Sequence, residues 1–322
     1  MNNLFRMIKK ILILRFSSIG DIVLTTPVIR CLKKQMPHCS IHYLTKSSYV
    51  SILESNPYID KVHVLNKHPL IKGIDLRAEK FDLIIDLHHN LRTFFIKKAL
   101  GIKAYAFPKL NIEKFLLVQL KINHLPNVHI VDRYLSTLKP LGIENDGNGL
   151  DYFIPQKDLI ENWNGFRPKD QVYNTWAIGA QHFTKRLPNH KIIEKAQQLP
   201  HLVVLLGGKE DQANGQIIAA ALGQKCINLC GQLNLNQSAS VVAQSLQLYS
   251  NDTGLMHIAA ALKISIVSFW GNTVPAFGMS PYYGNHLITQ QIVENTQIAC
   301  RPCSKIGHHA CPKKHFLCME TL

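Results

Sequence analysis

The stretch Ser-Asn-Asp-Thr-Gly-Leu-Met-His-Ile-Ala-Ala-Ala-Leu, residues 250–262, reads as a loop that turns directly into an alanine-rich helix between two apolar runs. We expect Asn251 or Asp252 to cap this helix with a side-chain oxygen, and Gly254 to let a ligand approach the backbone closely. The amides of the first helical turn have no partner inside the helix and favour anions. The segment therefore predicts either a phosphate site or an ordinary strand-to-helix turn.

A second loop, Arg-Phe-Ser-Ser-Ile-Gly-Asp-Ile-Val-Leu-Thr-Thr-Pro at residues 15–27, follows an apolar run at 11–14 that suits a buried parallel strand. We expect one amphipathic helix to continue through Leu32. The loop has neither a Walker lysine nor G-x-G-x-x-G spacing, so the usual ATPase and dinucleotide fingerprints are missing. Asp21 falls in the first helical turn. It is either a helix-capping residue, worth about 1 kcal/mol, or a general base where open α/β sheets hold ligands.

Strand-like apolar runs alternate with helical patterns along the chain, which favours parallel sheets covered by helices. These runs lie at residues 11–14, 41–44, 83–87, 176–178, 202–206, 246–249 and 264–269. The length of 322 residues and a hydrophobic content of 46% suit two domains. Glu-Asn-Asp-Gly-Asn-Gly at 144–149, followed by Pro155 and Pro168, is typical of a junction. We therefore expect domains at 1–160 and 161–322.

The two loops and four further segments together resemble glycosyltransferase family 9, the heptosyltransferases that build the inner core of lipopolysaccharide. The last of the segments is similar to the cysteine-containing end of the heptosyltransferase II group. The segments are RFSSIGDIVLTTPVIRCLKK (15–34), FDLIIDLHHNLRT (81–93), GAQHFTKRLP (179–188), LLGGKED (205–211), SNDTGLMHIAAAL (250–262) and CRPCSKIGHHACPKKHFLCM (300–319).

This resemblance implies an α/β fold of GT-B type, with two Rossmann-like domains whose parallel sheets face a central cleft. The domain at 1–160 would bind the acceptor, and the domain at 161–322 would bind the nucleotide sugar. The implied reaction is an inverting transfer of heptose from ADP-heptose to a lipopolysaccharide inner-core (lipid A-core) acceptor. The resemblance implies no catalytic metal and no required cofactor.

The resemblance also assigns the residues of the reaction. Asp21 matches the family's base, which takes the proton of the acceptor hydroxyl, a step typically worth ~10²–10⁴-fold. Lys185 matches a lysine that contacts phosphate, and the amides of Thr253 and Gly254 would add the helix terminus. Without a metal, the departing diphosphate needs such cations and dipoles fixed in advance.

Three residues are candidates for binding the donor's sugar or nucleoside. Glu210 matches the position that binds ribose, and a carboxylate can accept two ribose hydroxyl bonds. Asp252 would repel a diphosphate, so it either caps the helix or accepts bonds from sugar hydroxyls. His257 lies four residues after Thr253 on about the same helical face. It either bonds a phosphate or the sugar, or it is structural.

The acceptor side is expected in the basic first half, where residues 1–150 hold 22 basic and 11 acidic residues within a net charge of +15 for the chain. Such a surface suits a phosphorylated acidic lipid, because anionic membranes attract basic residues by about 1 kcal/mol each. Alternatively it is a solvated face, or it binds nucleic acid nonspecifically. The candidate acceptor residues follow a strand: Asp86, His89, Asn90 and Arg92.

Four of the eight cysteines are clustered near the end of the chain. The set Cys300, Cys303, Cys311 and Cys318 permits a tetrahedral structural zinc site. Free thiols or a disulfide are the alternatives, and three histidines are alternative ligands: His308, His309 and His315. The scattered cysteines are expected to be reduced: Cys31, Cys39, Cys226 and Cys230.

The sequence predicts a cytoplasmic protein with peripheral contact with the inner membrane. No apolar run reaches the ~18 residues of a transmembrane helix, and the N-terminal apolar run is too short for a signal peptide. Three other functions stay open. The chain could be a family 9 transferase that uses another NDP-sugar, a GT-B-shaped binding protein without transfer activity, or a basic, zinc-stabilised nucleic-acid-binding protein. The absence of a recognisable nucleic-acid module argues against the last of these.

Overall fold

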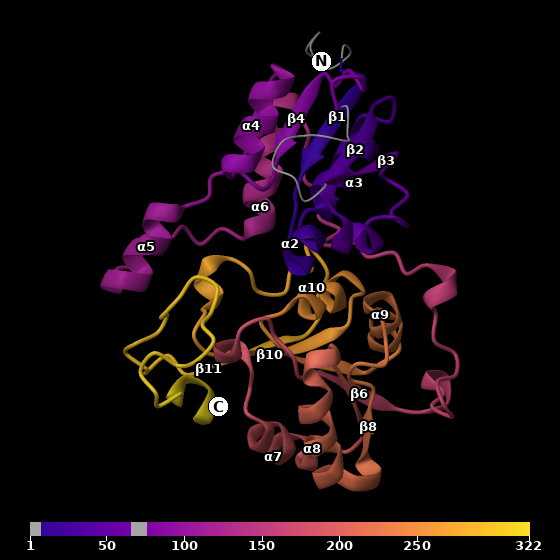
Figure 1. Ribbon diagram of the computed structural model, residues 1–322, viewed down its shortest axis with the longest axis vertical. Coiled ribbons are helices and arrows are strands. Elements are labelled where there is room, and N and C mark those ends of the chain that lie inside the picture. Colours follow the sequence, from indigo (N-terminus) through magenta and orange to yellow (C-terminus); the bar gives the residue numbers. More distant parts are fainter. Residues whose placement is uncertain (1–7, 66–75) are drawn as a thin grey trace. The chain divides into compact units, whose positions relative to one another are not determined.

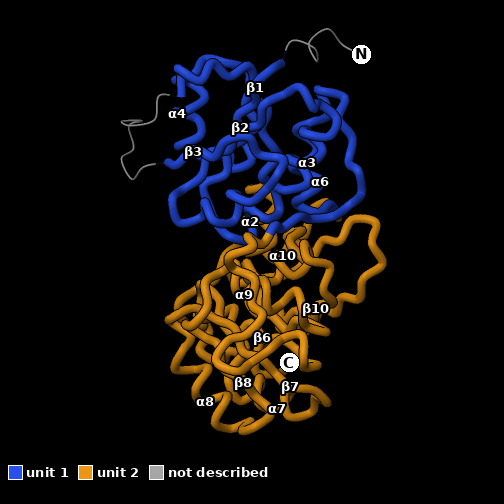
Figure 2. The backbone as a smooth tube through the Cα atoms, turned by 90° about the vertical axis from the view of Figure 1, so that its right-hand side faces the viewer, with its two compact units in different colours: residues 1–109, 128–153 blue, residues 110–127, 154–322 orange. Residues whose placement is uncertain are grey.

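A computed structural model describes residues 8–65 and 76–322 of the chain. It divides into two compact units (Figure 2). Unit 1 comprises residues 1–109 and 128–153, and unit 2 comprises residues 110–127 and 154–322. The sequence suggested one crossing near residue 160. In the structure the division falls at 153/154, and residues 110–127 group with unit 2.

Unit 1 is built on a parallel sheet with the strand order β3-β2-β1-β4-β5 in its described residues (Figure 1). An apolar run forms most of β1, and the apolar residues of β2 are interrupted by His42. Both strands are almost wholly buried, as expected where helices cover both faces of a sheet. The strands are β1 (Lys10–Leu14), β2 (Ser40–Lys46), β3 (Lys61–Leu65), β4 (Leu83–Asp86) and β5 (Ala104–Ala106). The helices are α2 (Ile19–Val23), α3 (Thr26–Gln35), α4 (Leu91–Leu100) and α6 (Ile130–Leu135).

The helix expected after β1 is broken into α2 and α3 at Leu24 and Thr25. Pro27 stands in the first turn of α3, where its missing amide hydrogen is not needed. In one continuous helix, the same proline would remove a hydrogen bond and crowd the preceding turn. Asp21 therefore belongs to a separate short helix directly after β1.

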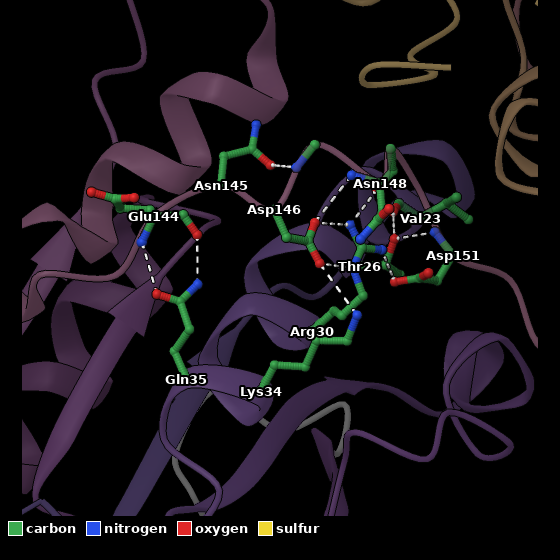
Figure 3. Close-up of polar contacts among 12 residues, drawn as sticks. Val23, Thr26, Arg30, Lys34, Gln35, Glu144, Asn145, Asp146, Asn148 and Asp151 are labelled. Atoms are coloured by element: carbon green, nitrogen blue, oxygen red, sulfur yellow. Dashed lines mark hydrogen bonds and ion pairs between the residues drawn. The ribbon is translucent and has the colours of Figure 1, made fainter. Parts of the chain in front are cut away.

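A buried arginine holds the segment 144–151 against α3 within unit 1 (Figure 3). Arg30 is 2% exposed, donates to both carboxylate oxygens of Asp146 at 2.8 Å and to the Gly149 carbonyl at 2.8 Å, and pairs with Asp151. The hydrogen bond from Arg30 holds the pKa of the Asp146 carboxyl below its usual range. The turn-rich stretch expected to join two domains is thus a packed part of unit 1.

Replacing Arg30 with methionine should lower the free energy of unfolding by about 3–5 kcal/mol, because it leaves two half-buried carboxylates without their cation. Lys34→Met is the matched control, since the Lys34 ammonium is 3.5 Å from Asp146 and its side chain is 47% exposed. That control should cost less than about 1 kcal/mol. Urea denaturation measures both values. Equal, small losses for the two variants would show that the Arg30 contacts do not hold the segment.

Unit 2 has a parallel sheet with the order β11-β10-β9-β6-β7-β8. Trp176 lies at the centre of its core, stacked on Tyr249 and Phe269 with ring centroids 4.8 and 5.7 Å away. The strands are β6 (Tyr173–Ala177), β7 (Leu202–Leu206), β8 (Cys226–Asn228), β9 (Gln247–Asn251), β10 (Ser265–Trp270) and β11 (Gln290–Glu294). The helices are α5 (Asn111–Leu120), α7 (Asn189–Gln198), α8 (Gln212–Leu222), α9 (Leu235–Ala243), α10 (Gly254–Ala261) and α11 (Leu317–Glu320).

Helix α5 belongs to unit 2 although its neighbours in sequence belong to unit 1. Leu117 and Val118 on its buried face pack on Phe277. Lys121, just after the helix, donates to the carbonyls of Cys300 and Pro302 at 3.0 and 2.7 Å. In the described residues, none of the helices combines the length and the apolar character that crossing a membrane requires.

Candidate active site

Asp21 lies in the first turn of α2, at the carboxyl end of β1, as the sequence predicts. One carboxylate oxygen accepts from the Ser18 hydroxyl at 2.8 Å and from the Ser18 amide at 3.2 Å. The other is 2.7 Å from the Arg15 guanidinium. The Asp21 side chain is 21% exposed, so solvent and ligands can reach it. It caps its own helix and also presents a carboxylate at the sheet edge, so the two interpretations are compatible.

Arg15 is the buried cation that orients Asp21. It also donates to the carbonyls of Ser17 and Leu87 at 2.7 and 2.6 Å and to the Tyr134 hydroxyl at 2.9 Å. Burial lowers the pKa of Arg15, but Asp21, Tyr134 and Tyr43 together outweigh it and the net shift is upward. Sequence reasoning missed this role. A cation directly after a buried apolar strand is the signal that could have shown it.

His88 is a second site neighbour that sequence reasoning missed. Its ring lies 4.7 Å from that of Phe16, centroid to centroid. Burial, assisted by the nearby charge of Arg15, lowers the pKa of His88 to about 4. Its Nδ1 is buried and has no hydrogen-bond partner among the described residues. The imidazole is therefore neutral at neutral pH and keeps a polar atom available beside the Asp21 loop.

The four predicted acceptor-side residues lie at the end of β4 and the start of α4. Asp86 is fully buried: it accepts from the amides of His88 and His89 at 3.1 and 2.7 Å, and Lys97 lies 2.8 Å from its other oxygen. Asn90 caps α4 by accepting from the Thr93 amide at 3.0 Å. Asp86 and Asn90 thus hold the loop, whereas His89 and Arg92 are exposed.

Helix α10 in unit 2 begins at Gly254 with Thr253 as its N-cap residue, and among the described residues no side-chain hydrogen bond caps it. The expected capping by Asn251 or Asp252 is wrong. Asn251 is fully buried, where its side chain accepts from the Leu187 amide and donates to the Ile178 carbonyl, both at 3.0 Å. Its amide group thus joins two loops instead. The first-turn amides of α10 remain uncapped by any side chain, as an anion site requires.

Lys185 lies beside this helix start, as the phosphate assignment requires. Its ammonium is 2.5 Å from the Asp252 carboxylate, whose same oxygen accepts from the Thr273 hydroxyl at 2.9 Å. The side chains of Lys185 and Asp252 are 17% and 12% exposed. Asp252 is therefore the counter-ion of Lys185, a pairing that the sequence did not indicate because the two residues are far apart in the chain.

Glu210 and His257 occupy contrasting environments. Glu210 is exposed in the turn after β7, and its carboxylate folds back over the backbone of Gly208. His257 is 2% exposed within α10. Asp211, next to Glu210, accepts from the Gly208 amide at 3.0 Å and pairs with Arg186 at 3.3 Å. Arg186 thus joins two loops of unit 2.

All eight cysteines are free thiols. The four tail cysteines lie near one another: the thiols of Cys300, Cys303 and Cys311 all influence the pKa of Cys318, which burial raises to about 12. In residues 8–65 and 76–322, however, no three of the tail's cysteine and histidine ligand atoms lie within 4.8 Å of one another. Cys318 itself is buried in the core of unit 2. Cys300 is 3.8 Å from the ring nitrogen of His315. The thiols are thus grouped in unit 2 but not at metal-binding distances, and the zinc site stays a prediction.

The sequence profile of glycosyltransferase family 9 (heptosyltransferase) matches residues 72–312. The chain belongs to this family. This family 9 glycosyltransferase is 26% identical to lipooligosaccharide heptosyltransferase 2 of Haemophilus influenzae, over 92% of each chain. It is 24% identical to lipopolysaccharide heptosyltransferase 2 of Escherichia coli, over 83% of this chain and 84% of that one.

Solved structures agree with the fold of this family 9 transferase. A glycosyl transferase family 9 protein from Veillonella parvula matches with a TM-score of 0.70 and 22% identity, covering 89% of this chain and 86% of that chain. The ADP-heptose lipopolysaccharide heptosyltransferase II of E. coli matches with a TM-score of 0.66 and 21% identity, covering 97% and 98%. The predicted GT-B class, with two parallel-sheet α/β domains, is confirmed. Family membership sets aside both non-enzymatic alternatives.

Proposed function

We propose that the chain transfers heptose from ADP-heptose to a lipopolysaccharide inner-core acceptor, with inversion at the anomeric carbon. The observation that carries the proposal is the family match over 72–312 together with a reachable carboxylate, Asp21, directly after β1. The curated relatives are heptosyltransferases, and one solved neighbour, with 19% identity, is an E. coli heptosyltransferase with ADP.

In the proposed reaction, Asp21 accepts the proton of the acceptor hydroxyl while that oxygen attacks the anomeric carbon. The bond from that carbon to the diphosphate oxygen breaks, and ADP leaves. Arg15 and Ser18 hold the Asp21 carboxylate, so its orientation costs nothing when the reaction begins. Unit 1 thus supplies the base.

Unit 2 supplies the donor site. Lys185 and the uncapped amides at the start of α10 stabilise the charge that grows on the leaving diphosphate. Asp252 keeps Lys185 in place, and Glu210 accepts hydrogen bonds from the ribose hydroxyls. His257 supports the sugar or phosphate end of the donor from within α10.

Because fixed cations and dipoles stand in for a metal, we expect EDTA to leave the initial rate of heptose transfer within about twofold of the untreated enzyme. The assay supplies ADP-heptose and a heptose-deficient lipopolysaccharide, and the anomeric configuration of the product reports inversion. Prompt loss of activity that Mg²⁺ restores would contradict a metal-free chemical step. A retained configuration would contradict direct displacement.

We further propose that α4 contacts the membrane that carries the acceptor, on its cytoplasmic face. Leu91, Phe94 and Phe95 on this helix are 73%, 53% and 57% exposed, and Lys98 and Arg92 accompany them. Apolar side chains flanked by cations suit an anionic bilayer surface. His89, just before this helix, and Arg92, in its first turn, are exposed and are the acceptor-side candidates that can reach a phosphorylated substrate.

Replacing both Phe94 and Phe95 with serine should lower binding to vesicles of phosphatidylglycerol and phosphatidylethanolamine by about tenfold or more, since each phenylalanine loses apolar burial in the bilayer. Co-sedimentation measures the effect, and Ile217→Ser on α8, also an exposed apolar residue at 56%, is the matched control. If both variants bind vesicles like the wild type, α4 does not contact the membrane.

A further inference from the structure

Two buried histidines and a glutamate meet in unit 1, and the proposed reaction uses none of them. His42 on β2 and His63 on β3 are 5% and 6% exposed, and Glu79 lies in the turn before β4. The strands pair with His42 opposite Lys61 and Leu44 opposite His63, so both histidines point to the same face of the sheet. In the described chain, this is the group of three His, Cys, Asp or Glu residues whose ligand atoms all lie within 4.8 Å.

The distances among the three ligand atoms suit a metal ion. Nδ1 of His42 is 2.9 Å from Nε2 of His63 and 3.8 Å from Oε2 of Glu79. Nε2 of His63 is 4.0 Å from Oε1 of Glu79. Tetrahedral zinc with bonds of about 2.0–2.2 Å places its ligands about 3.3–3.5 Å apart. The observed distances lie on both sides of that value, so shifts of a few tenths of an ångström would complete the site.

The surroundings of His42 match those of a metal-binding histidine. Its second ring nitrogen, Nε2, lies 3.1 Å from the Ser40 hydroxyl, and histidine ligands commonly donate their other N–H to such an oxygen.

Two lysines form ion pairs with the carboxylate of Glu79. Lys61 is 2.5 Å from Oε1 and Lys10 is 3.2 Å from Oε2. The Lys61 and Lys10 side chains are 55% and 30% exposed, so either ammonium can turn into water when a dication arrives. These lysines compete with a metal for the carboxylate, and removing one should tighten metal binding.

We propose that His42, His63 and Glu79 bind one Zn²⁺ ion, with water as the fourth ligand. His42 and His63 are the third residues of β2 and β3, and Glu79 contacts Lys10 at the start of β1, whereas Asp21 lies in α2 beyond the carboxyl end of β1. The metal therefore has no part in sugar transfer. It ties the edge strand β3 and the turn before β4 to β2.

The test titrates Co²⁺ and Zn²⁺ into the untagged, chelator-washed full chain. Bound Co²⁺ reports its ligands, because thiolate ligands give strong charge-transfer absorption in the near ultraviolet and nitrogen and oxygen ligands do not. We expect one Co²⁺ bound without thiolate absorption, and Zn²⁺ should displace it with a Kd on the order of 1 µM or tighter. This readout separates the cluster from the cysteines of the tail.

Variants then decide whether the cluster is the site. His63→Gln removes a ligand and should weaken Co²⁺ binding by at least about 100-fold. Ser40→Ala removes the hydroxyl that hydrogen-bonds the second ring nitrogen of His42 and should weaken it by about 10-fold. Lys61→Met should tighten it. His124→Gln, at an exposed position in unit 2, is the matched control and should change nothing.

If His63→Gln does not fold, Glu79→Gln decides, because its side chain is 19% exposed and its loss is tolerated more easily. Failure to bind Co²⁺ through nitrogen and oxygen, or binding that neither variant weakens, would overturn the proposal. The two rings would then form a single N–H···N hydrogen bond between neutral histidines. Neither result affects the proposed transfer reaction, whose residues lie elsewhere.

Discussion

Asp21→Asn should lower kcat for heptose transfer by about 10²–10⁴-fold while changing the affinity for ADP less than about twofold. The amide cannot accept the proton of the acceptor hydroxyl, but it has nearly the shape of the carboxylate and can still accept from Ser18 and Arg15. Asparagine is preferred to alanine, because alanine would leave the buried Arg15 charge without its partner and cost about 3–5 kcal/mol of stability. Initial rates at saturating donor measure the change.

Ser18→Ala is the matched control for this variant. It removes the 2.8 Å hydrogen bond to Asp21 but keeps both the carboxylate and the Arg15 contact. Its kcat should fall far less than that of Asp21→Asn, because the base itself and its Arg15 partner remain. Wild-type turnover by a folded Asp21→Asn protein would remove Asp21 from the chemistry and leave it as a helix cap.

Lys185→Ala should raise the Kd for ADP by about 10–150-fold, the range of a charged hydrogen bond worth about 1.5–3 kcal/mol. The loss has two parts. The diphosphate loses its cation, and Asp252 loses the counter-ion that lies 2.5 Å away, so its negative charge then repels the ligand. Adenosine, which has no phosphate, should lose less than about twofold. Calorimetric titration with both ligands measures the difference.

The double variant Lys185→Ala, Asp252→Ala separates these two parts. Removing the unpaired carboxylate should recover some of the lost ADP affinity, so the two changes should not be additive. Lys191→Ala on α7 is the control, since that lysine pairs only with Glu194 on the surface among its described contacts. Equal losses for ADP and adenosine would contradict a phosphate role. Thermal-shift comparison with UDP, GDP and CMP then tests the adenine preference.

The strands found from the sequence are the interior strands of the two sheets. Apolar runs predicted β1, β2 and β4 in unit 1, and β6, β7, β9 and β10 in unit 2. The strands that were missed are β3, β5, β8 and β11, and each lies at an edge of its sheet. An interior parallel strand is buried on both faces and needs a continuous apolar run. An edge strand such as Gln290–Glu294 is largely exposed and carries polar residues, so its composition gives no such signal.

The position of a site residue could be predicted where it depends on one continuous segment of sequence. Asp21 falls in the first turn of α2 because only residues 15–18 separate this helix from the end of β1. Arg15 and Asp21 belong to one segment, the connection from β1 into α2, and the position of Arg15 directly after a buried strand was an available signal. The Lys185–Asp252 pair was not predictable, because it depends on how two separate loops of unit 2 meet. The capping prediction failed for the same reason, since Asn251 is taken up by contacts with a loop more than 60 positions earlier.

The path of the chain also limits how the protein can be dissected. Residues 110–127 leave unit 1, pack α5 on Phe277, and return at residue 128, so the polypeptide passes between the units at three places. A fragment ending at residue 153 would contain α5 without Phe277, so Leu117 and Val118 would be exposed to solvent. The complementary fragment would lack α5, so Phe277 would be exposed. Chimaeras that exchange unit 2 between family members therefore need to exchange residues 110–127 together with residues 154–322.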